Sequence, residues 1–320
     1  MLTNLEISQQ FPEWDVTRIS EKTGIEARHI AAEDEYSSSL GVSAARILLS
    51  SAELDISEFD YLIAVSQTPD FILPGIASLI HSELQMNRSA GAIDVNLGCS
   101  GYVYALGLAK GLIESGQANN VLLVTSDTYS KLLNPEDKSV RTIFGDGATA
   151  TWISSGGADD SIAGFSYGTD GSGAEHLIVP NGGMRPGDEF STKASADARN
   201  FPSSQFDLFM NGPEIFNFTL REVGRTLEDV LEKSNLSLDL VDFVLFHQAN
   251  AFMLNHLIAK LKIPAHKAPI LMKHWGNTVS GTIPMALTEL YERGAIRPGS
   301  KLVLLGFGVG LSWAGASVCL

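Results

Sequence analysis

The chain has 320 residues, of which 44% are hydrophobic, and its 22 basic and 37 acidic residues give a net charge of −15. This length can bury a large core, either in one large domain or in two domains of roughly 150 residues. The excess of acidic residues argues against nucleic acid and anionic membranes as partners.

The sequence contains no segment typical of a membrane span or a secretory leader. No run approaches the roughly 20 apolar residues that a membrane helix needs, and the N-terminus lacks a basic region followed by an apolar core. Two cysteines, Cys99 and Cys319, do not make a disulfide framework. We therefore expect a cytoplasmic protein with no membrane partner.

Strands and helices are predicted to alternate along the chain. Near-continuous apolar runs predict strands buried on both faces, and helical patterns lie between them. The predicted strands are 60–66, 91–97, 120–126, 241–247, 269–274 and 301–307, and the predicted helices are 75–85, 100–115, 213–234, 249–262 and 283–293. Residues 154–203 are rich in Gly, Ser, Asp and Pro, which predicts hairpins and loops. This order predicts a layered α/β architecture.

The sequence also contains an internal repeat. The segments 98–116 and 276–294 both start at a glycine before a helix and end at a glycine after it, 18 residues later (116 − 98 and 294 − 276). Each is followed by a short loop and an apolar strand. Cys99 and Asn277 hold the same place in the two copies. We therefore expect two related halves whose helix N-termini face one pocket.

The stretch "DVNLGCSGYVY" places Cys99 between two glycines at the expected start of a helix. Unpaired N–H groups and the helix dipole favour negative charge there, so we expect the thiol to ionise more readily than a free thiol of pKa about 8.5. The dipole supplies only roughly 0.3–1 kcal/mol, which is less than one pKa unit. A nearby imidazole would have to supply the rest. Cys99 is thus either a nucleophile or a small buried hydrophobic residue.

Other motifs are less informative by themselves. His247, at the end of a predicted strand, suits either a cleft or a structural role, and Asn277 could be an ordinary helix N-cap. The sequence "GFGVG" (306–310) is not followed by a helix, so it does not fit a dinucleotide-binding loop. The motif "GFSYG" around Ser166 matches a serine-hydrolase elbow but lacks the helix that should follow it. No motif indicates a metal site.

Five motifs together resemble one family. They are "DVNLGCSGYVYALGLAKGLIESG", "TIFGDGATA", "FHQAN", "HWGNTVSGTIPMAL" and "LLGFGVGLSWAGA". In this order they resemble β-ketoacyl-acyl-carrier-protein synthase III, of the thiolase-fold superfamily. The resemblance implies a homodimer and a five-layered αβαβα body built of two thiolase-like halves. Residues 1–170 would form the half with the cysteine, and residues 171–320 the half with the histidine and asparagine.

The resemblance also implies a mechanism. Cys99, His247 and Asn277 would be the catalytic triad. The cysteine would take an acyl group from an acyl thioester such as acyl-CoA. The other two would then stabilise the enolate formed when malonyl-acyl-carrier-protein loses CO2. The backbone N–H groups of Cys99 and Val309 would form the oxyanion hole, and no metal or organic cofactor would be needed.

The chain departs from the family pattern in two regions. The family's first strand, ahead of "TNLEI", is absent, so we expect the true start to lie upstream of Met1, while "FDLFMNG" (206–212) is its expected counterpart in the second half. Phe252 and Asn217 stand where members that use an acidic carrier protein often have basic residues. The implied substrate contacts are Trp14, Arg28, Leu73, Lys138, Arg141, Phe216 and Asn250.

Three alternatives stay open at this point. The same scaffold could pass the acyl group on Cys99 to a hydroxyl or an amine, as an acyltransferase of a secondary or surface-polysaccharide pathway. The chain could be a non-catalytic partner subunit, although the intact triad argues against this. A hydrolase acting through Ser166 is the third alternative. The sequence specifies neither the acyl starter nor the pathway.

Overall fold

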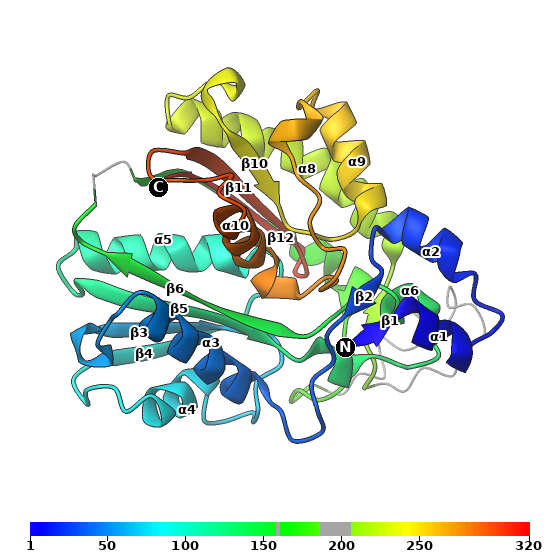
Figure 1. The fold of residues 1–320 in the computed structure, drawn as a ribbon, viewed down its shortest axis with the longest axis horizontal. Helices are drawn as coiled ribbons and strands as arrows, with labels where there is room; N and C mark the ends of the chain where they lie inside the picture. Colours follow the sequence, from blue (N-terminus) through cyan, green and yellow to red (C-terminus); the bar gives the residue numbers. More distant parts are fainter. Residues whose placement is uncertain (158–160, 186–205) are drawn as a thin grey trace.

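The structure is a computed structural model that describes residues 1–157, 161–185 and 206–320. Its two four-stranded sheets have the strand orders β4-β3-β5-β6 and β10-β11-β12-β7. Helices α5 and α10 lie between the sheets, α3 and α4 cover the outer face of the first sheet, and α8 and α9 cover that of the second (Figure 1). The expected five-layered, thiolase-like α/β architecture is therefore confirmed.

The first sheet and its helices come from the N-terminal part of the chain. The elements are β1 (Leu2–Thr3), α1 (Asn4–Gln10), α2 (Val16–Thr23), β2 (Ala27–Arg28), α3 (Ser37–Ser51), β3 (Tyr61–Val65), α4 (Ile76–Glu83), β4 (Gly91–Val95), α5 (Gly101–Glu114), β5 (Asn120–Asp127), α6 (Lys138–Arg141) and β6 (Gly147–Ser154). In the first four-stranded sheet β4, β3 and β5 are parallel and β6 is antiparallel to β5, while β1 and β2 form a separate antiparallel pair.

The second sheet and its helices follow. The elements are β7 (Ile162–Thr169), β8 (Leu177–Ile178), β9 (Phe209–Met210), α8 (Gly212–Lys233), β10 (Phe243–Phe246), α9 (Ala251–Lys260), α10 (Thr282–Glu292), β11 (Lys301–Gly308) and β12 (Ser312–Cys319). Short 3-10 turns are η1 (Ile56–Glu58), η2 (Tyr129–Leu132), η3 (Gly171–His176), η4 (Leu238–Leu240), η5 (Ala265–Lys267) and η6 (Val279–Gly281). All five predicted helices and five of the six predicted strands are present.

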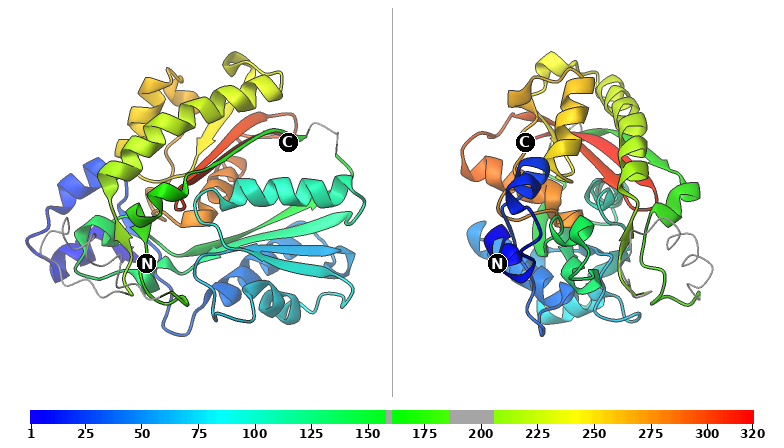
Figure 2. Two further views of the ribbon diagram at one scale, coloured as in Figure 1. Left: turned by 180° about the vertical axis from the view of Figure 1, so that it is seen from behind. Right: turned by 90° about the vertical axis from the view of Figure 1, so that its right-hand side faces the viewer.

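The central strands are buried on both faces, which explains their continuous apolar sequences. In β3, Ile63 and Val65 join the core between the two sheets, while Leu62 and Ala64 join the core under α3 and α4. The same alternation divides β11 between the inter-sheet core and the core under α8 and α9. Figure 2 shows α5 running through the middle of this sandwich.

The two sheets repeat one arrangement, as the internal repeat predicts. In each, two parallel strands (β3 and β5, or β10 and β11) are followed by an antiparallel third (β6 or β12). The central helices α5 and α10 are followed by Gly116 and Gly294, with left-handed φ of +73° and +67°. These glycines end the two helices because a side chain is disfavoured in that conformation.

The segment 269–274 is not a strand, contrary to the prediction. Gln248 Oε1 accepts a hydrogen bond from Leu271 N–H at 2.8 Å. Farther along, the carbonyl of Lys273 accepts one from Glu26 N–H at 2.8 Å. These bonds occupy backbone groups that a ladder with β10 would require, so the apolar run does not extend the sheet.

Strand β7 lies within the region 154–203 that was predicted as hairpins and loops. It pairs antiparallel with β12 in the second sheet. The segment 206–212, expected as the counterpart of a first strand, contributes only β9, which pairs with the short β8. That expectation is wrong, because β7 holds the sheet position beside β12. Residues 158–160 and 186–203 of the predicted loop region lie outside the described residues.

Candidate active site

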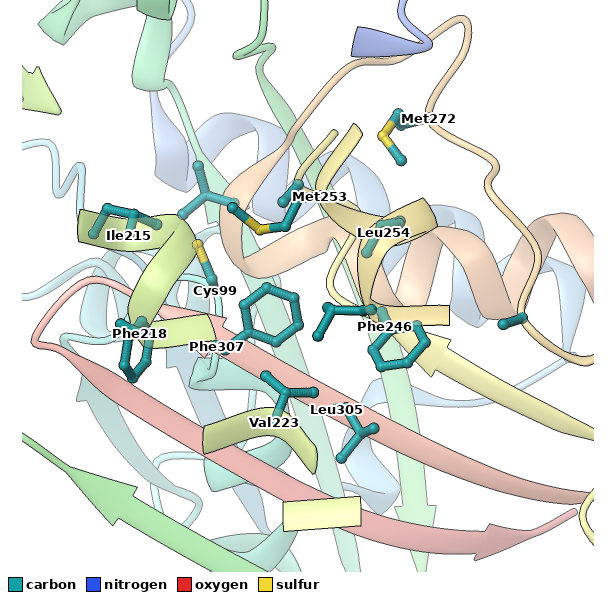
Figure 3. Close-up of a cluster of buried hydrophobic side chains, with 14 of the residues drawn as sticks. Cys99, Ile215, Phe218, Val223, Phe246, Met253, Leu254, Met272, Leu305 and Phe307 are labelled. Atoms are coloured by element: carbon teal, nitrogen blue, oxygen red, sulfur yellow. The ribbon is translucent and has the colours of Figure 1, made fainter. Parts of the chain in front are cut away.

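The three side chains predicted to be catalytic meet at one cavity of about 40 Å³. Cys99 comes from the start of α5, His247 from the end of β10 and Asn277 from the residues before η6. Figure 3 shows Cys99 beside Ile215 and Met253. The other lining residues are Ile143, Phe144, Leu177, Met210, Ala249, Asn250, Phe307 and Gly308. The cavity has space for roughly one water molecule.

Two backbone N–H groups point at the Cys99 sulfur. They are its own N–H and that of Val309, the residue after β11. The turn at Val309 is fixed by Ser312, whose hydroxyl donates to the Val309 carbonyl at 2.8 Å and lies 2.7 Å from Ser100 Oγ. The two N–H groups that were predicted to form an oxyanion hole thus lie together at the Cys99 sulfur.

The glycines of "GFGVG" allow β11 to approach Cys99 closely. A Cβ at Gly308 would lie 2.7 Å from the Cys99 sulfur, and one at Gly306 would lie 2.7 Å from the Cys99 carbonyl oxygen. Real Cβ atoms essentially never come that close, so larger residues would displace Cys99. The glycines of this motif therefore allow close packing against Cys99.

The Cys99 thiol is a weaker acid than its helix position predicted. Its pKa is raised from 9.0 to about 12, first by burial and then by the carboxylate of Asp127. The two N–H groups at the sulfur act in the opposite direction. The helix dipole, at roughly 0.3–1 kcal/mol, is too small to offset burial. The expectation of an easily ionised thiol is wrong for the unliganded site.

Asn277 is held from both halves. Its N–H donates to the Ile143 carbonyl at 2.9 Å, and its own carbonyl accepts from Gly145 N–H at 3.0 Å. Its side-chain Oδ1 accepts from Val279 N–H at 3.0 Å. This bond fixes the amide so that Nδ2 faces His247 Nε2 at 3.4 Å. The "TIFGDGATA" motif of the first half thus positions a catalytic candidate of the second.

His247 lies directly after β10, and its backbone N–H donates to the Leu305 carbonyl at 2.7 Å. On the ring, Nδ1 is 2.7 Å from Thr282 Oγ1, and the Val279 carbonyl is a further hydrogen-bond partner. Burial lowers the pKa of His247 from 6.5 to about 3. The ring is therefore neutral near pH 7, with one nitrogen able to donate and the other able to accept.

A buried carboxylate, Asp127 at the end of β5, connects the two halves. Its Oδ2 accepts from the hydroxyl of Ser280 and from Ser280 N–H at 3.2 Å. Its Oδ1 accepts from Gln67 N–H at 2.8 Å. Burial raises the pKa of Asp127 from 3.8 to about 6, although these hydrogen bonds act to lower it. Asp127 fixes the η6 turn that follows Asn277.

The predicted substrate contacts lie in different surroundings. Asn250 lines the cavity and caps α9, since its Oδ1 accepts from Met253 N–H at 2.9 Å. Phe216 packs against Phe252, with ring centroids 5.5 Å apart. Leu73 is 80% exposed and lies away from the cavity within this chain.

Trp14 and Arg28 have packing roles that their predicted ligand contacts did not anticipate. Trp14 is buried between α1 and α2, against Ile7 and Ile19, and stacks on Phe11 at 4.2 Å between ring centroids. Arg28 is fully buried and donates to the Thr142 carbonyl at 2.8 Å. Burial, and then the charge of Arg141, lowers the pKa of Arg28 to about 10. In this structure neither Trp14 nor Arg28 presents a free surface to a ligand.

Lys138 and Arg141 are both half-buried in α6. The helix directly precedes Ile143 and Gly145, the residues that anchor Asn277. Burial lowers the pKa of Arg141, and the carboxylate of Asp146 acts in the opposite direction. Their predicted phosphate contacts stay predictions.

Sequence reasoning missed Asp127, Thr282 and the apolar wall around Met253. Hydroxyl, carboxyl and apolar residues are too common for their type alone to mark a site. The only signal was the internal repeat, because Thr282 begins the helix that corresponds to the one after Cys99.

Two family models match the chain. The model for 3-oxoacyl-[acyl-carrier-protein (ACP)] synthase III matches residues 93–171, and the model for the C terminal of the same synthase matches residues 231–319. The β-ketoacyl-[acyl-carrier-protein] synthase III of Clostridium perfringens (strain 13 / Type A) is 35% identical over 319 residues, which is 100% of this chain and 95% of that protein. The chain belongs to the β-ketoacyl-[acyl-carrier-protein] synthase III family.

Solved structures of 3-oxoacyl-(acyl-carrier-protein) synthases have the same fold. A crystal structure of a 3-oxoacyl-(acyl-carrier-protein) synthase III is 46% identical, covers 100% of this chain and 95% of that chain, and has a TM-score of 0.93. The 3-oxoacyl-(acyl-carrier protein) synthase of Burkholderia xenovorans LB400 is 39% identical, covers 100% and 90%, and also has a TM-score of 0.93. The chain is thus a condensing enzyme of the acyltransferase class.

The structure also bears on three other features: the hydrolase motif at Ser166, metal sites and membrane-spanning helices. Ser166 lies within β7 and donates to Asp229 Oδ2 at 3.0 Å, so it is not at the strand-to-helix turn of a hydrolase elbow. Within the described residues, no group of three or more His, Cys, Asp or Glu side chains could hold a metal ion. In the same part of the chain, no helix has the length and apolarity needed to cross a bilayer.

Proposed function

We propose that this synthase joins an acyl group carried on Cys99 to the two-carbon unit of a malonyl thioester, with acyl-CoA as the acyl donor and malonyl-acyl-carrier-protein as the extender. One observation carries the proposal: a thiol, two N–H donors, an Asn amide and a neutral imidazole converge on one cavity. This set suits acyl transfer followed by stabilisation of an enolate.

In the first step, the Cys99 sulfur attacks the thioester carbonyl of the acyl donor. Because the thiol is un-ionised in the resting site, the Cys99 sulfur gives up its proton as the new carbon–sulfur bond forms. The N–H groups of Cys99 and Val309 stabilise the oxyanion. The intermediate collapses to acyl-Cys99 as the bond between the carbonyl carbon and the CoA sulfur breaks, and the departing CoA sulfur takes the proton that Cys99 gave up.

In the second step, the malonyl thioester loses CO2, and the electron pair forms an enolate. His247 Nε2–H and Asn277 Nδ2–H donate to the enolate oxygen. The carbanion carbon then attacks acyl-Cys99, whose oxyanion is held by the same two backbone N–H groups. Release of the 3-oxoacyl thioester leaves a Cys99 thiolate, which regains a proton from solvent. Only residues of this chain act in the scheme, so we propose that no metal or organic cofactor is used.

The test is intact-protein mass spectrometry after exposure to a panel of acyl-CoAs and then to malonyl-acyl-carrier-protein. The expected result is a single acyl adduct on Cys99 that disappears as a 3-oxoacyl product is released. An adduct that persists with malonyl donors but is transferred to alcohols or amines would refute condensation. Failure of every acyl-CoA to load, with loading from acyl-carrier-protein instead, would refute the proposed donor.

We further propose that the enzyme is a homodimer joined beside β4. Three consecutive apolar side chains, Phe71, Ile72 and Leu73, are 58%, 70% and 80% exposed, more than soluble surfaces usually show. β4 is also an edge strand of the first sheet, with its outer side unpaired among the described residues. Light scattering should give twice the chain mass for the wild type and the monomer mass for Ile72→Asp. A monomeric wild type at micromolar concentration would contradict the proposal.

Docking of an acidic carrier protein needs a local positive surface on a chain of charge −15. Lys22 lies over the ring of Phe252, 5.5 Å from its centroid, beside the helix α9 that carries Lys260 near its end. We propose this face of α9 for the carrier protein, and the cytoplasm, which supplies acyl-CoA and carrier proteins, as the place of action.

A further inference from the structure

A buried carboxylate acts on the thiol that the proposed function uses as its nucleophile. Asp127, at the end of β5, is completely buried, and its charge helps to raise the pKa of Cys99. A carboxylate in this place therefore opposes formation of the thiolate. Burial of a charge is itself unfavourable unless hydrogen bonds compensate for it. The hydrogen bonds of Asp127 indicate what outweighs these two disadvantages.

The two carboxylate oxygens of Asp127 accept from two different turns. Oδ1 accepts from Gln67 N–H at 2.8 Å, just beyond the end of β3. Oδ2 accepts from Ser280 N–H at 3.2 Å and from the Ser280 hydroxyl, in η6. A backbone N–H can only donate, so both oxygens of the side chain must act as acceptors. An asparagine side chain, which has one oxygen and one NH2 group, could not satisfy both N–H groups.

The η6 turn carries the contact that orients Asn277. Val279 N–H donates to Asn277 Oδ1 at 3.0 Å, one residue before the Ser280 N–H that Asp127 accepts from. Val279 has a left-handed backbone with φ of +55°, which β-branched residues rarely adopt. Such a conformation persists where the surrounding contacts enforce it. The carboxylate supplies two of these contacts at the very next residue.

The two turns held by Asp127 also meet beside the residue that precedes the nucleophile. A Cβ at Gly98 would overlap Gln67 Oε1 and would lie 3.0 Å from Val279 Cγ1. Gln67 Oε1 in turn accepts from the Tyr129 hydroxyl at 2.9 Å. The turn after β3 and the η6 turn therefore both pack against the segment before α5. Asp127 links these two turns at the cavity that holds the thiol.

We propose that Asp127 is a positioning residue for condensation, whose carboxylate acts through Ser280 to hold the η6 turn so that the Asn277 amide faces the cavity. This role rests on the proposed function, in which that amide donates to the enolate oxygen. The same charge disfavours the Cys99 thiolate, so one side chain affects the two steps in opposite directions. A residue that only stabilised the fold would support both steps alike.

Two variants separate the charge of Asp127 from its hold on the turn. Asp127→Asn removes the charge and places an NH2 group against one of the two backbone N–H groups. Ser280→Ala keeps the charge and removes one donor from the turn. The matched control is Asp60→Asn, at the opposite end of the same sheet, where a half-buried carboxylate accepts from Asn119 N–H at 2.6 Å and from Asn120 N–H at 3.1 Å.

Condensation should slow in both variants of the turn, because the Asn277 amide is no longer fixed. Misplacement of a reacting group by 1 Å can cost about 10²-fold in rate, so we expect kcat to fall about 10- to 100-fold in Asp127→Asn and about tenfold in Ser280→Ala. The side-chain amide NMR signal of Asn277, identified by its absence in Asn277→Ala, should move in both. The Asp60→Asn control should match the wild type in rate and in signal.

The thiol should respond only to the variant that changes the charge. Asp127→Asn should lower the pKa of Cys99, measured as the rate of alkylation by iodoacetamide against pH, and each unit raises the thiolate fraction about tenfold. Acyl loading should be at least as fast as in the wild type. Ser280→Ala and the control should leave both properties unchanged. Tyr129 and His247, the titratable side chains that also lie near the thiol, are the same in all these proteins.

Several outcomes would overturn the proposal. They are a joint fall of loading and condensation in Asp127→Asn, an unchanged rate of condensation, or an Asn277 amide signal that does not move. An unchanged thiol pKa in Asp127→Asn would contradict the opposing effect of the charge. Ser280→Ala decides the positioning role even if Asp127→Asn does not fold. A wild type that loads but never condenses, with an amide signal that moves in both variants, would refute the proposed function and keep the role of Asp127 in placing the amide.

Discussion

The helix starts at Cys99 and Asn277 occupy equivalent places in the two halves but present different groups to the cavity. Cys99 lies two residues before α5, whereas Asn277 lies five residues before α10 (101 − 99 and 282 − 277). The additional residues of the second half form η6. In the first half, the short segment before α5 places the Cys99 thiol and its own N–H at the cavity. In the second half, the longer segment before α10 places the Asn277 amide there, and Thr282 contacts the His247 imidazole. The length of the turn before the helix thus decides whether a half presents a thiol or an amide with an imidazole.

The strongest test of this division of labour replaces the two equivalent residues separately. Cys99→Ala should lower both acyl loading and condensation by at least about 10³-fold, because the nucleophile is lost. Asn277→Ala should lower condensation by about 10²-fold and leave loading intact, because the amide acts on the enolate. Mass spectrometry of the adduct and a product assay measure the two steps. Loss of loading in Asn277→Ala would show that the second half also serves the first step.

A smaller effect is expected from the contact between β11 and the nucleophile. In Gly308→Ala the new Cβ would lie 2.7 Å from the Cys99 sulfur. Misplacement of a reacting atom by 1 Å can cost about 10²-fold in rate, so loading should fall by one to two orders of magnitude. The matched control is Gly111→Ala in α5, where nothing lies within 4 Å of the new Cβ. Equal loading rates in both variants would contradict the proposed role of Gly308.

Two buried titratable groups, one from each half, should give the unfolding free energy opposite pH dependences. Asp127 has its pKa raised from 3.8 to about 6, so the folded state binds more protons and this contribution to stability falls as pH rises between those values. His247 has its pKa lowered from 6.5 to about 3, so its contribution is present above pH 6.5 and is lost as pH falls toward 3. Each pKa unit corresponds to about 1.4 kcal/mol.

Denaturant unfolding from pH 4 to pH 7 separates the two contributions. On acidification Asp127→Asn should lose stability more steeply than the wild type, because the stability that Asp127 gains by binding a proton is then missing. His247→Gln should lose stability less steeply, because the cost of protonating a buried His247 is then missing. If the free energy of unfolding changed with pH in the same way in all three proteins, folding would shift the pKa of neither Asp127 nor His247, and both pKa shifts would be refuted.

The smallest effect concerns the ends of the two central helices. Gly116 and Gly294 have φ of +73° and +67°, and a Cβ at either would meet nothing within 4 Å. Replacing either with Ala should cost about 1–2 kcal/mol of unfolding free energy, through backbone strain alone. Urea denaturation should give nearly equal costs, with condensation rates unchanged. Unequal costs would show that the two helix ends are less alike than their sequence spacing.

Sequence patterns predicted the strands that are buried on both faces, since those are the strands with continuous apolar runs. They did not identify β6 ("GATATWIS") or β7 ("IAGFSYGT"), whose small and hydroxylated residues give a weak pattern. They wrongly predicted a strand at 269–274, because apolar content does not reveal that the Leu271 N–H donates to the Gln248 side chain instead of to a neighbouring strand. The long N-terminal helix α3 was also not predicted, since its Ser and Ala residues leave no clear stripe.

Cys99 and Asn277 could be predicted from the sequence, because they hold the same position in the two copies of the internal repeat and lie in motifs that resemble the family. The acidity of the thiol could not, because it depends on burial and on Asp127, which is distant in sequence. The roles of Thr282 and Asp127 depend on a single turn whose strained residue, Val279, carries no sequence signal. The sequence pattern therefore predicts neither the effect of distant charges on the Cys99 pKa nor the backbone conformation of Val279.

The groups around the Cys99 sulfur come from distant parts of the chain. The thiol is at residue 99, whereas Gly308, which admits it, is the last residue of β11, and its second N–H donor, Val309, lies between β11 and β12. Val309 follows Cys99 by 210 residues (309 − 99), so during synthesis on the ribosome the thiol exists long before these partners. A nascent chain therefore carries an ordinary, unsupported cysteine. Acyl-enzyme formation would report that the whole polypeptide, and not only its first half, has assembled.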